Sequence, residues 1–357
     1  MDLKLSRAEQ NFRDEIAGFV DRAFPVSVRE NPSVADEAGW HEAVAGQGWT
    51  AVEWPAEYGG PGWKPMEMYL WYSVTLNANC PSADYCALHV VGPLLQHFGD
   101  PENRSLHLQN IIDRVQFWGN AVFLDGSSSV SQTSTGNNFL LHGDTPCIAA
   151  SAKLDWVLLL ASTGNTFSLF LLDLDMKGVN LVQTANSPDV FRLTLDQVQI
   201  PASCLLGKEG KGLKYLISLM TNSNPVSSVV HLQLALSNLK KIVKQQGLNS
   251  EMGSQLAALE IELSALEVTG LRSSLSGHTE NTAIATIRGH SLARKISDSF
   301  KDALGYYALP DERSDPGRNE PVMALPDLKL KFWHTDYLPG CPPGFRQDLM
   351  AKTLLGL

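Results

Sequence analysis

Gly48-Trp49-Thr50-Ala51-Val52-Glu53-Trp54-Pro55-Ala56-Glu57-Tyr58-Gly59-Gly60-Pro61-Gly62-Trp63 is the stretch of sequence that decides the fold. Three Trp, two Pro and four Gly stand within its sixteen residues. Proline restricts the backbone, glycine allows left-handed conformations, and buried aromatic rings anchor a turn. The composition therefore predicts a rigid connector, in which Trp54 and Tyr58 have a structural role.

The whole chain has 357 residues, of which 44% are hydrophobic and 18% are charged, an ordinary composition for a globular protein. Its net charge of −10 repels nucleic-acid phosphates and anionic lipids, so we expect binding to neither nucleic acid nor a membrane surface. The N-terminal residues lack a signal-peptide pattern, and no apolar run approaches the length of a membrane span. We therefore expect a cytoplasmic protein.

The cysteines and histidines give no metal-binding pattern. The five cysteines are odd in number, widely spaced and free of any Cys-x-x-Cys pair, which is typical of reduced thiols. His89, His97 and His107 match no recognised ligand spacing with a Cys or a carboxylate, which favours surface or core positions for them. We assign no metal ligands.

Hydrophobic periodicity divides the chain into three parts. Residues 1–115 carry apolar side chains at helical spacing, for example Phe12, Ile16 and Phe19. Residues 116–200 contain short β-type runs separated by Gly, Ser, Asn and Pro. Helical stripes return in residues 201–357, and long amphipathic helices of this kind indicate a four-helix bundle. The runs expected as strands are 117–124, 139–141, 156–161, 167–174 and 191–200.

Local motifs along the chain resemble those of acyl-CoA dehydrogenases. Residues 54–60 are similar to the family's Trp-Pro-x-Glu-Tyr-Gly-Gly, and residues 200–212 to the Val-Pro-x-x-x-x-Leu-Gly-x-x-x-x-Gly turn that opens its bundle. Residues 351–357 match the closing Ala-Lys-x-x-Leu-Gly-Leu. With further matches at 91–99 and 170–179, these motifs span nearly the whole chain in collinear order.

The resemblance implies both a fold and an activity. The fold is α+β, with an N-terminal α-helical domain (1–115), a middle β-barrel or sandwich domain (116–200) and a C-terminal four-helix bundle (201–357). The activity is the α,β-desaturation of an acyl-CoA thioester, in which FAD takes a hydride while a carboxylate removes the α proton. That base is indispensable because the α carbon is only weakly acidic.

The two positions at which the family places its catalytic Glu hold no carboxylate here. Aligned back from residues 351–352, the first position reads Gly340-Cys341-Pro342-Pro343-Gly344-Phe345. The second reads Leu219-Met220-Thr221-Asn222-Ser223. We therefore assign no catalytic residue. Glu57 and Asp125 are the carboxylates that could supply a stray base, although nothing in the sequence places either one at a substrate α carbon.

Positions that hold the flavin in the family also differ. Residues 123–129 correspond to the family's Glu-Pro segment and Gly-Ser-Asp turn, and they are several residues shorter. Cys147 stands at about the place of a Trp that flanks the flavin ring. Lys244 lies near the place of a phosphate-binding Arg, and Asp302 and Gly305 fall within the family's Gln-x-x-Gly-Gly motif. The candidate cofactor-binding residues are therefore Lys244 and Gly305. Lys244 also fits a solvated-face lysine, residues 127–129 also fit a flexible turn, and the charge of Asp302 opposes phosphate.

Three functions agree with these residues. The first is the degenerate subunit of a heteromeric acyl-CoA dehydrogenase, resembling the α2β2 enzymes of bacterial steroid side-chain degradation. Its partner would be a homologous catalytic subunit holding most of the FAD contacts, its substrate an acyl-CoA such as a steroid side-chain CoA ester, and its electron acceptor an electron-transfer flavoprotein. The second is a stand-alone, non-catalytic CoA-ester-binding or scaffold protein. The third is a homotetrameric dehydrogenase with a relocated base.

Overall fold

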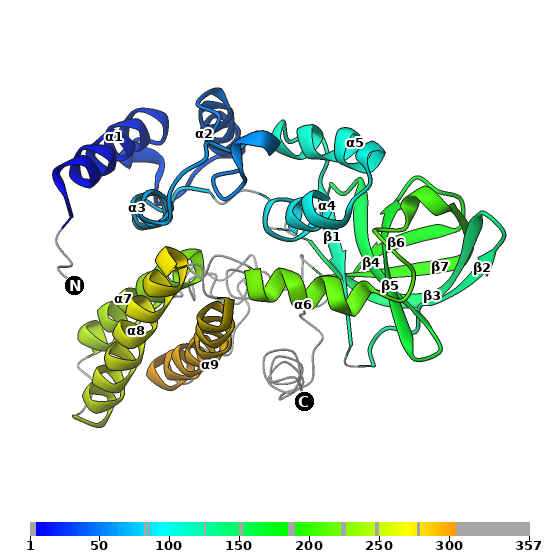
Figure 1. Ribbon diagram of the computed structural model, residues 1–357. Helices are drawn as coiled ribbons and strands as arrows, with labels where there is room; N and C mark the ends of the chain where they lie inside the picture. The colour runs from blue at the N-terminus through cyan, green and yellow to red at the C-terminus, as the bar shows by residue number, and fades with distance from the viewer. Residues whose placement is uncertain are drawn as a thin grey trace. The chain divides into compact units, whose positions relative to one another are not determined.

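The structure is a computed structural model that describes residues 5–81, 84, 86–124, 126–149, 153–184, 190–222, 226–246, 250–276 and 279–304. The chain forms two compact units, whose elements are labelled in Figure 1. The helical unit takes its described residues from Met1–Asn31, Lys64–Cys80 and Asn224–Asp336. The mixed unit takes its described residues from Pro32–Trp63 and Pro81–Ser223.

The helical unit joins helices from the start of the chain with helices from its last third. Helix α1 begins at a capping box, in which the Ser6 hydroxyl accepts from the Glu9 N–H (3.3 Å) and the Glu9 carboxylate accepts from the Ser6 N–H (2.6 Å). Helix α3 contacts α1, α7 and α8. The helices are α1 (Arg7–Ala23), α3 (Pro65–Asn77), α7 (Val226–Gln246), α8 (Ser250–Ser276) and α9 (Thr279–Leu304), with the 3-10 turn η1 (Val26–Val28).

Helices α7, α8 and α9 lie side by side (Figure 1) and share one apolar core. Each helix presents a stripe of leucines or similar residues three and four positions apart, which is the pattern that buries one helical face. The stripes include Leu232, Leu236 and Leu239 on α7, Leu259, Leu263 and Leu266 on α8, and Leu292, Ile296 and Phe300 on α9.

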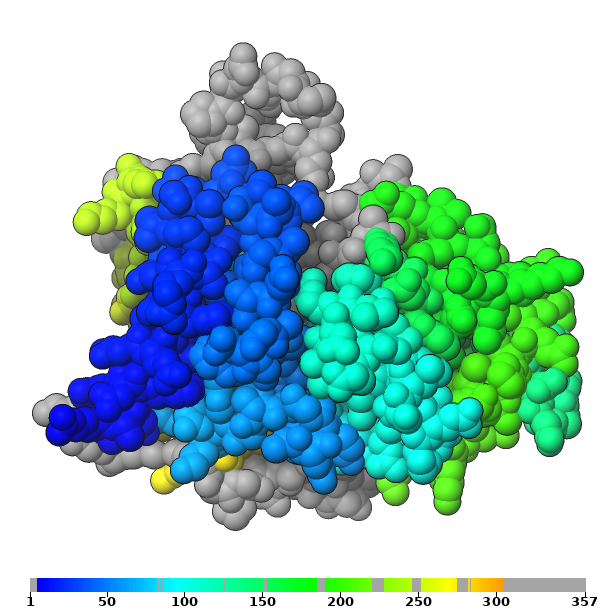
Figure 2. Space-filling view, turned by 90° about the horizontal axis from the view of Figure 1, so that it is seen from above, coloured from blue at the N-terminus to red at the C-terminus, as the bar shows by residue number. Residues whose placement is uncertain are grey.

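The mixed unit combines short helices with the whole sheet. In the space-filling view of Figure 2, the cyan atoms of α4 and α5 adjoin the green atoms of the strands. The helical elements are α2 (Val34–Gly46), η2 (Ala56–Tyr58), the π-helix η3 (Cys86–Val91), α4 (Gly92–Phe98), α5 (Pro101–Ile112), η4 (Ala202–Cys204) and α6 (Gly212–Asn222).

The strands pair in the order β1–β4–β2–β3–β7–β6, with β5 beside β4. Strand β1 also pairs with β3 at Asn120 and Ile148, so β1, β4, β2 and β3 form a closed ring of pairings, as in a small barrel. The strands are β1 (Trp118–Ala121), β2 (Ser131–Thr135), β3 (Asn138–Ile148), β4 (Trp156–Thr163), β5 (Thr166–Asp173), β6 (Val179–Gln183) and β7 (Val190–Pro201).

The connector 48–63 is built around one buried tryptophan. The Trp54 side chain is only 2% exposed, and its ring fills the space beside Gly92, where an added Cβ would come within 2.0 Å of the ring. At Gly60 an added Cβ would come within 1.9 Å of the Trp54 carbonyl oxygen, and Gly59 takes a left-handed φ of 88°. The two glycines therefore let the chain turn tightly around Trp54, which has the structural role that the sequence predicts.

The predicted fold class is confirmed: helices come first, a sheet follows, and helices return. Residues 305–357 of the predicted bundle range, 201–357, lie outside the described residues. Helices of the range 1–115 contribute to both units, and two short strands, β2 and β6, were not among the predicted runs. Among the helices that the structure describes, none combines the length and the apolar composition that crossing a membrane requires.

Candidate functional site

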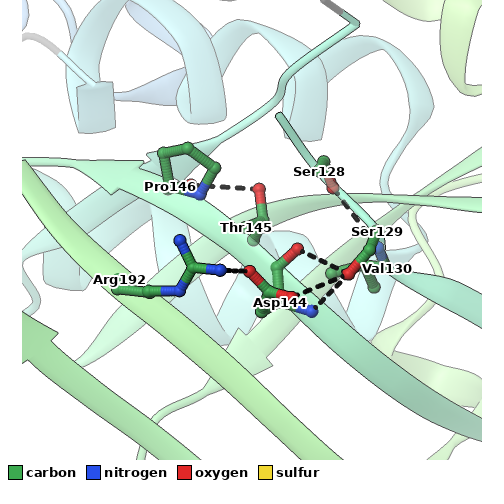
Figure 3. Close-up of polar contacts among 7 residues, drawn as sticks. All are labelled: Ser128, Ser129, Val130, Asp144, Thr145, Pro146 and Arg192. Atoms are coloured by element: carbon green, nitrogen blue, oxygen red, sulfur yellow. Dashed lines mark hydrogen bonds and ion pairs between the residues drawn. The ribbon is translucent and has the colours of Figure 1, made fainter. Parts of the chain in front are cut away.

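The serine segment 127–129 follows β1 and lies along the middle of β3 (Figure 3). The main-chain N–H of Ser129 donates to the Asp144 carbonyl oxygen (2.8 Å), and the Asp144 N–H donates to the Ser129 hydroxyl oxygen (2.9 Å). The Ser129 hydroxyl in turn donates to the Asp144 carboxylate, Oδ1, at 2.9 Å. Both donors of Ser129 are thus engaged by Asp144.

Arg192 on β7 supplies the second partner of Asp144. Strand β7 runs antiparallel to β3 and places Arg192 opposite Pro146. The Arg192 guanidinium forms an ion pair with Asp144 Oδ2, on the other side of the carboxylate from Ser129 (Figure 3). Ser129, Asp144 and Arg192 together are called the Asp144 network below. Its carboxylate is neutralised by one cation and hydrogen-bonded by one hydroxyl, so it is satisfied within the chain.

Gly143 makes this close contact possible. Its φ of 126° lies in the region open to glycine, and an added Cβ would come within 2.5 Å of the Ser129 carbonyl oxygen. The β3–β7 register also shifts between Leu141 and Gly143. Beside this point the Val130 N–H donates to the Ser128 hydroxyl oxygen at 3.4 Å. The serine segment therefore contacts β3 at Gly143 and Asp144.

Cys147 is fully buried in the core of the sheet. Its sulfur lies where an added Cβ on Gly119 would come within 2.7 Å, and burial raises the pKa of the thiol to about 12. A thiol of this kind stays protonated and unreactive. Cys147 stands at about the place where the family has a Trp beside the flavin ring. Here its side chain packs inside the sheet.

The other residues singled out from the sequence do not take part in the Asp144 network. Lys244 is exposed in the last turn of α7, and Asp302 is exposed on α9, both in the helical unit. Glu57 is exposed in η2 of the mixed unit. Gly305, Asp125 and Gly340 lie outside the described residues. The assignment of Lys244 and Gly305 to a cofactor stays a prediction.

The structure adds a second polar pair that sequence analysis did not find. Nδ1 of His89, in η3, lies 3.3 Å from Oε2 of Glu53 in the connector, and both side chains are largely buried. No local sequence signal pairs these residues, because they are far apart in the chain and only the fold of the connector brings them together. The described residues contain no group of three or more His, Cys, Asp and Glu side chains placed to hold a metal ion.

Comparison with known proteins shows what this chain is similar to. Residues 6–114 match the family model "Acyl-CoA dehydrogenase, N-terminal domain". "Acyl-CoA dehydrogenase IpdE1" of Mycobacterium tuberculosis (strain ATCC 25618 / H37Rv) is 23% identical, over 92% of this chain and 90% of its own length. The structure of the ChsE4-ChsE5 complex from Mycobacterium tuberculosis matches with a TM-score of 0.71 and 17% identity, covering 100% of this chain and 99% of that chain. The "Tcur3481-Tcur3483 steroid ACAD" matches with a TM-score of 0.73 and 16% identity, over the same two shares.

Proposed function

We propose that this chain, which has the acyl-CoA dehydrogenase fold and resembles acyl-CoA dehydrogenases along its length, is the non-catalytic subunit of a heteromeric, FAD-dependent member. The Asp144 network is the observation that carries the proposal. In the family, the segment that corresponds to residues 127–129 offers donors to the flavin. Here the hydroxyl and the N–H of Ser129 are used by Asp144 instead.

The chemistry of the segment does not fit a flavin phosphate. A phosphate needs free N–H and O–H donors, and it is repelled by a carboxylate that it cannot displace. In the Asp144 network the anion is already present, and Arg192, which could attract a phosphate, is paired with it. The buried Cys147 cannot supply an aromatic face. We therefore expect this chain alone to hold little or no FAD, with the cofactor bound mainly by a partner.

The residues at the two family positions for the base support the same conclusion. Helix α6 includes one of the two family positions for the base, and its sequence contains no Asp or Glu. Removal of an α proton requires a carboxylate within hydrogen-bonding reach of that proton. We assign the base to a homologous catalytic subunit, and an electron-transfer flavoprotein to the role of electron acceptor.

The relatives support a mixed assembly and suggest a substrate class. One matched structure is a complex of two differently named chains, ChsE4 and ChsE5, and another is described as a steroid ACAD. By analogy, we propose an α2β2 assembly and a steroid side-chain CoA ester as the substrate. The leucine stripes of α7, α8 and α9 provide the packed bundle that such an assembly requires.

Co-expression with homologues encoded nearby tests the proposal. The purified material is measured for intact-complex mass and for absorbance at flavin wavelengths. We expect a mixed complex that carries flavin and forms enoyl-CoA with an artificial electron acceptor, while this chain purified alone is colourless. A yellow homo-oligomer with about one flavin per chain, or the lack of any mixed complex, would overturn the proposal.

A further inference from the structure

Helix α8 has a second apolar stripe, on the side that faces away from the shared core of the bundle. Ala258, Ile261, Ala265 and Val268 follow one another at spacings of three and four residues, and all four side chains are exposed. Ile261 is 71% exposed and Val268 is 45% exposed. Because each residue turns an α-helix by about 100°, these four residues, called the outer stripe below, lie roughly opposite the buried leucines of the same helix.

Ion pairs border the outer stripe on both sides. Glu260 pairs with Lys240 of α7, and Glu262 pairs with Lys295 of α9. Single exposed hydrophobic residues are ordinary on a protein surface, whereas an apolar row with charged flanks is the pattern of a helix that packs against another helix. The outer stripe therefore has the form of a contact surface for a further helix.

The antiparallel pairing of α8 and α9 fixes which part of α9 lies beside each end of the outer stripe. The Ser273 and Thr282 hydroxyl oxygens are 2.6 Å apart, and Glu262 pairs with Lys295 about three turns further along the two helices. The same offset places the last turn of α9, which contains Asp302, level with the first turns of α8. Asp302 thus lies beside the end of the stripe that is nearest to the start of α8.

Two unmatched charges stand at opposite ends of the outer stripe. Arg272 is exposed and continues the same row one turn after Val268, and the exposed Asp302 lies beside the other end. Lys301, the neighbour of Asp302 in the sequence, is paired with Asp298 at 2.9 Å. Neither Arg272 nor Asp302 forms an ion pair with another residue of the described ranges. The face is therefore basic at one end and acidic at the other.

We propose that the outer stripe is a contact between two copies of this chain, in which the two α8 helices pair antiparallel about a two-fold axis. With the axis midway between Ile261 and Ala265, each Ile261 faces Ala265 of the second copy. Each Val268 then faces Ala258 of the second copy. A large side chain meets a small one at every step, which is the arrangement that lets two helices pack closely. A surface that is complementary to itself in this way fits a second copy of the same chain.

The antiparallel orientation also pairs the two unmatched charges. Arg272 of one copy comes level with the first turns of α8 in the other copy, and so lies beside its Asp302. Within one copy the two residues are about 27 Å apart along α8, so only a second copy brings them together. A parallel pair would instead place Arg272 against Arg272 and Asp302 against Asp302. Exposed ion pairs add little affinity, but they favour one orientation over the other.

Sedimentation velocity of the full chain, purified alone and measured over a range of concentrations, tests the proposal. We expect a reversible equilibrium between monomer and dimer. Ile261→Lys should raise the dissociation constant of the dimer by about tenfold or more, because it sets two cations at the centre of the contact. Val26→Lys is the matched control, since Val26 is also 71% exposed in the helical unit, and it should change nothing. A chain that is monomeric at every concentration, or a dimer insensitive to Ile261→Lys, would overturn the proposal.

Exchange of the two end charges tests the antiparallel orientation. Arg272→Asp and Asp302→Arg should each weaken the dimer by about fivefold, because each variant places like charges together across the contact. The double variant should recover most of the lost affinity, since the exchanged pair forms again between the two copies. A double variant that dimerises no better than the single variants rejects this orientation.

The thermal stability of the monomer distinguishes a second copy from another part of the same chain. At concentrations where both proteins are monomeric, Ile261→Lys should have the same Tm as the unchanged chain, because the side chain is exposed in the single subunit. A clearly lower Tm would show that the chain covers its own stripe, and the proposal would fail. Neither flavin nor a partner enters these measurements, so their outcome is independent of the proposed function.

Discussion

The indole nitrogen of Trp54 donates a hydrogen bond of 2.7 Å to the main-chain oxygen of Leu88, in the π-helix Cys86–Val91. The bond joins the connector to the segment that leads into α4, and it is completely enclosed. Because the Trp54 ring also rests on Gly92, the connector, the π-helix and the first residue of α4 depend on a single side chain. π-Helices are rare and occur mostly as single turns within α-helices.

Gly92→Ala is expected to destabilise the mixed unit by several kcal/mol, because the added methyl group would overlap the Trp54 ring. Trp54→Phe should cost about 1–3 kcal/mol through the lost hydrogen bond and the smaller ring. Urea unfolding followed by fluorescence measures both variants. Gly39→Ala, in α2 with open space at its Cβ, is the control and should be neutral or slightly stabilising. Equal stability of all three variants would contradict the role given to Trp54.

Gly143→Ala should lower stability more than Ser129→Ala. The alanine methyl would meet the Ser129 carbonyl group, and φ at this position is unfavourable for any side chain. Ser129→Ala removes only the hydroxyl, which is exposed to solvent on one side, and should cost about 1 kcal/mol. Denaturant midpoints compare the two. A larger loss of stability for Ser129→Ala would mean that the segment is held on β3 mainly by the hydrogen bonds of the Asp144 network and not by the close approach of the two backbones.

Acidification should destabilise the mixed unit in a range set by His41. Its pKa is about 4 in the folded protein and 6.5 in the unfolded chain, so between these values the unfolded state binds more protons. The stabilising contribution is complete above pH 6.5 and is lost as the pH falls toward 4. His41→Gln should flatten this part of the stability profile. His107, whose pKa burial also lowers, acts in the same direction, so some slope should persist. A profile unchanged by His41→Gln would refute the assignment.

Replacing single carboxylates of this chain should leave acyl-CoA oxidation by the mixed complex intact. The variants to assay are Glu57→Gln, Asp125→Asn and Asp302→Asn. Glu57 and Asp125 are the carboxylates that could supply a stray base, and Asp302 lies in the family's Gln-x-x-Gly-Gly motif. Replacing the catalytic Glu of the partner should abolish turnover. A loss of about a thousandfold for one variant of this chain, with the complex and its flavin preserved, would place the base here.

Leu263→Asp should break the shared core of α7, α8 and α9, since it buries a charge without a partner. Complex yield and flavin content are expected to fall together, as measured by native mass and absorbance. Ile261→Ser, two positions away on the same helix and 71% exposed, is the matched control and should change the stability of the isolated chain by less than about 0.5 kcal/mol. If Leu263→Asp assembles normally, the bundle core is not needed for the complex.

Strands with long buried apolar runs could be predicted from the sequence, and the two missed strands are short and largely exposed. Strand β2 reads Ser-Gln-Thr-Ser-Thr, and of its residues only Gln132 is buried, held by hydrogen bonds to Ser168 and Glu209. Strand β6 is an edge strand with largely exposed side chains. Strand β3 extends far beyond the predicted run 139–141, because pairing with β7 carries it through Gly143 and Pro146, two residues that end a strand pattern when read locally.

The candidate site was predictable only as a set of unusual residues. The sequence marks residues 127–129 and Cys147, but it cannot show that Ser129 faces Asp144, since this depends on the close approach of the two backbones at Gly143. Arg192 joins them through a strand pairing between residues nearly fifty positions apart, for which no local pattern exists.

The composition of the helical unit affects the order in which the protein can fold during synthesis. Helices α1 and α3 are synthesised early, yet α7 and α8, which α3 contacts in this unit, emerge only after the entire sheet. The mixed unit can therefore complete its strand pairing while the apolar sides of α1 and α3 still lack a covering surface. Nascent chains that end before α7 leave this hydrophobic surface exposed, and chaperones bind such surfaces, so synthesis of this protein is expected to rely on them at that stage.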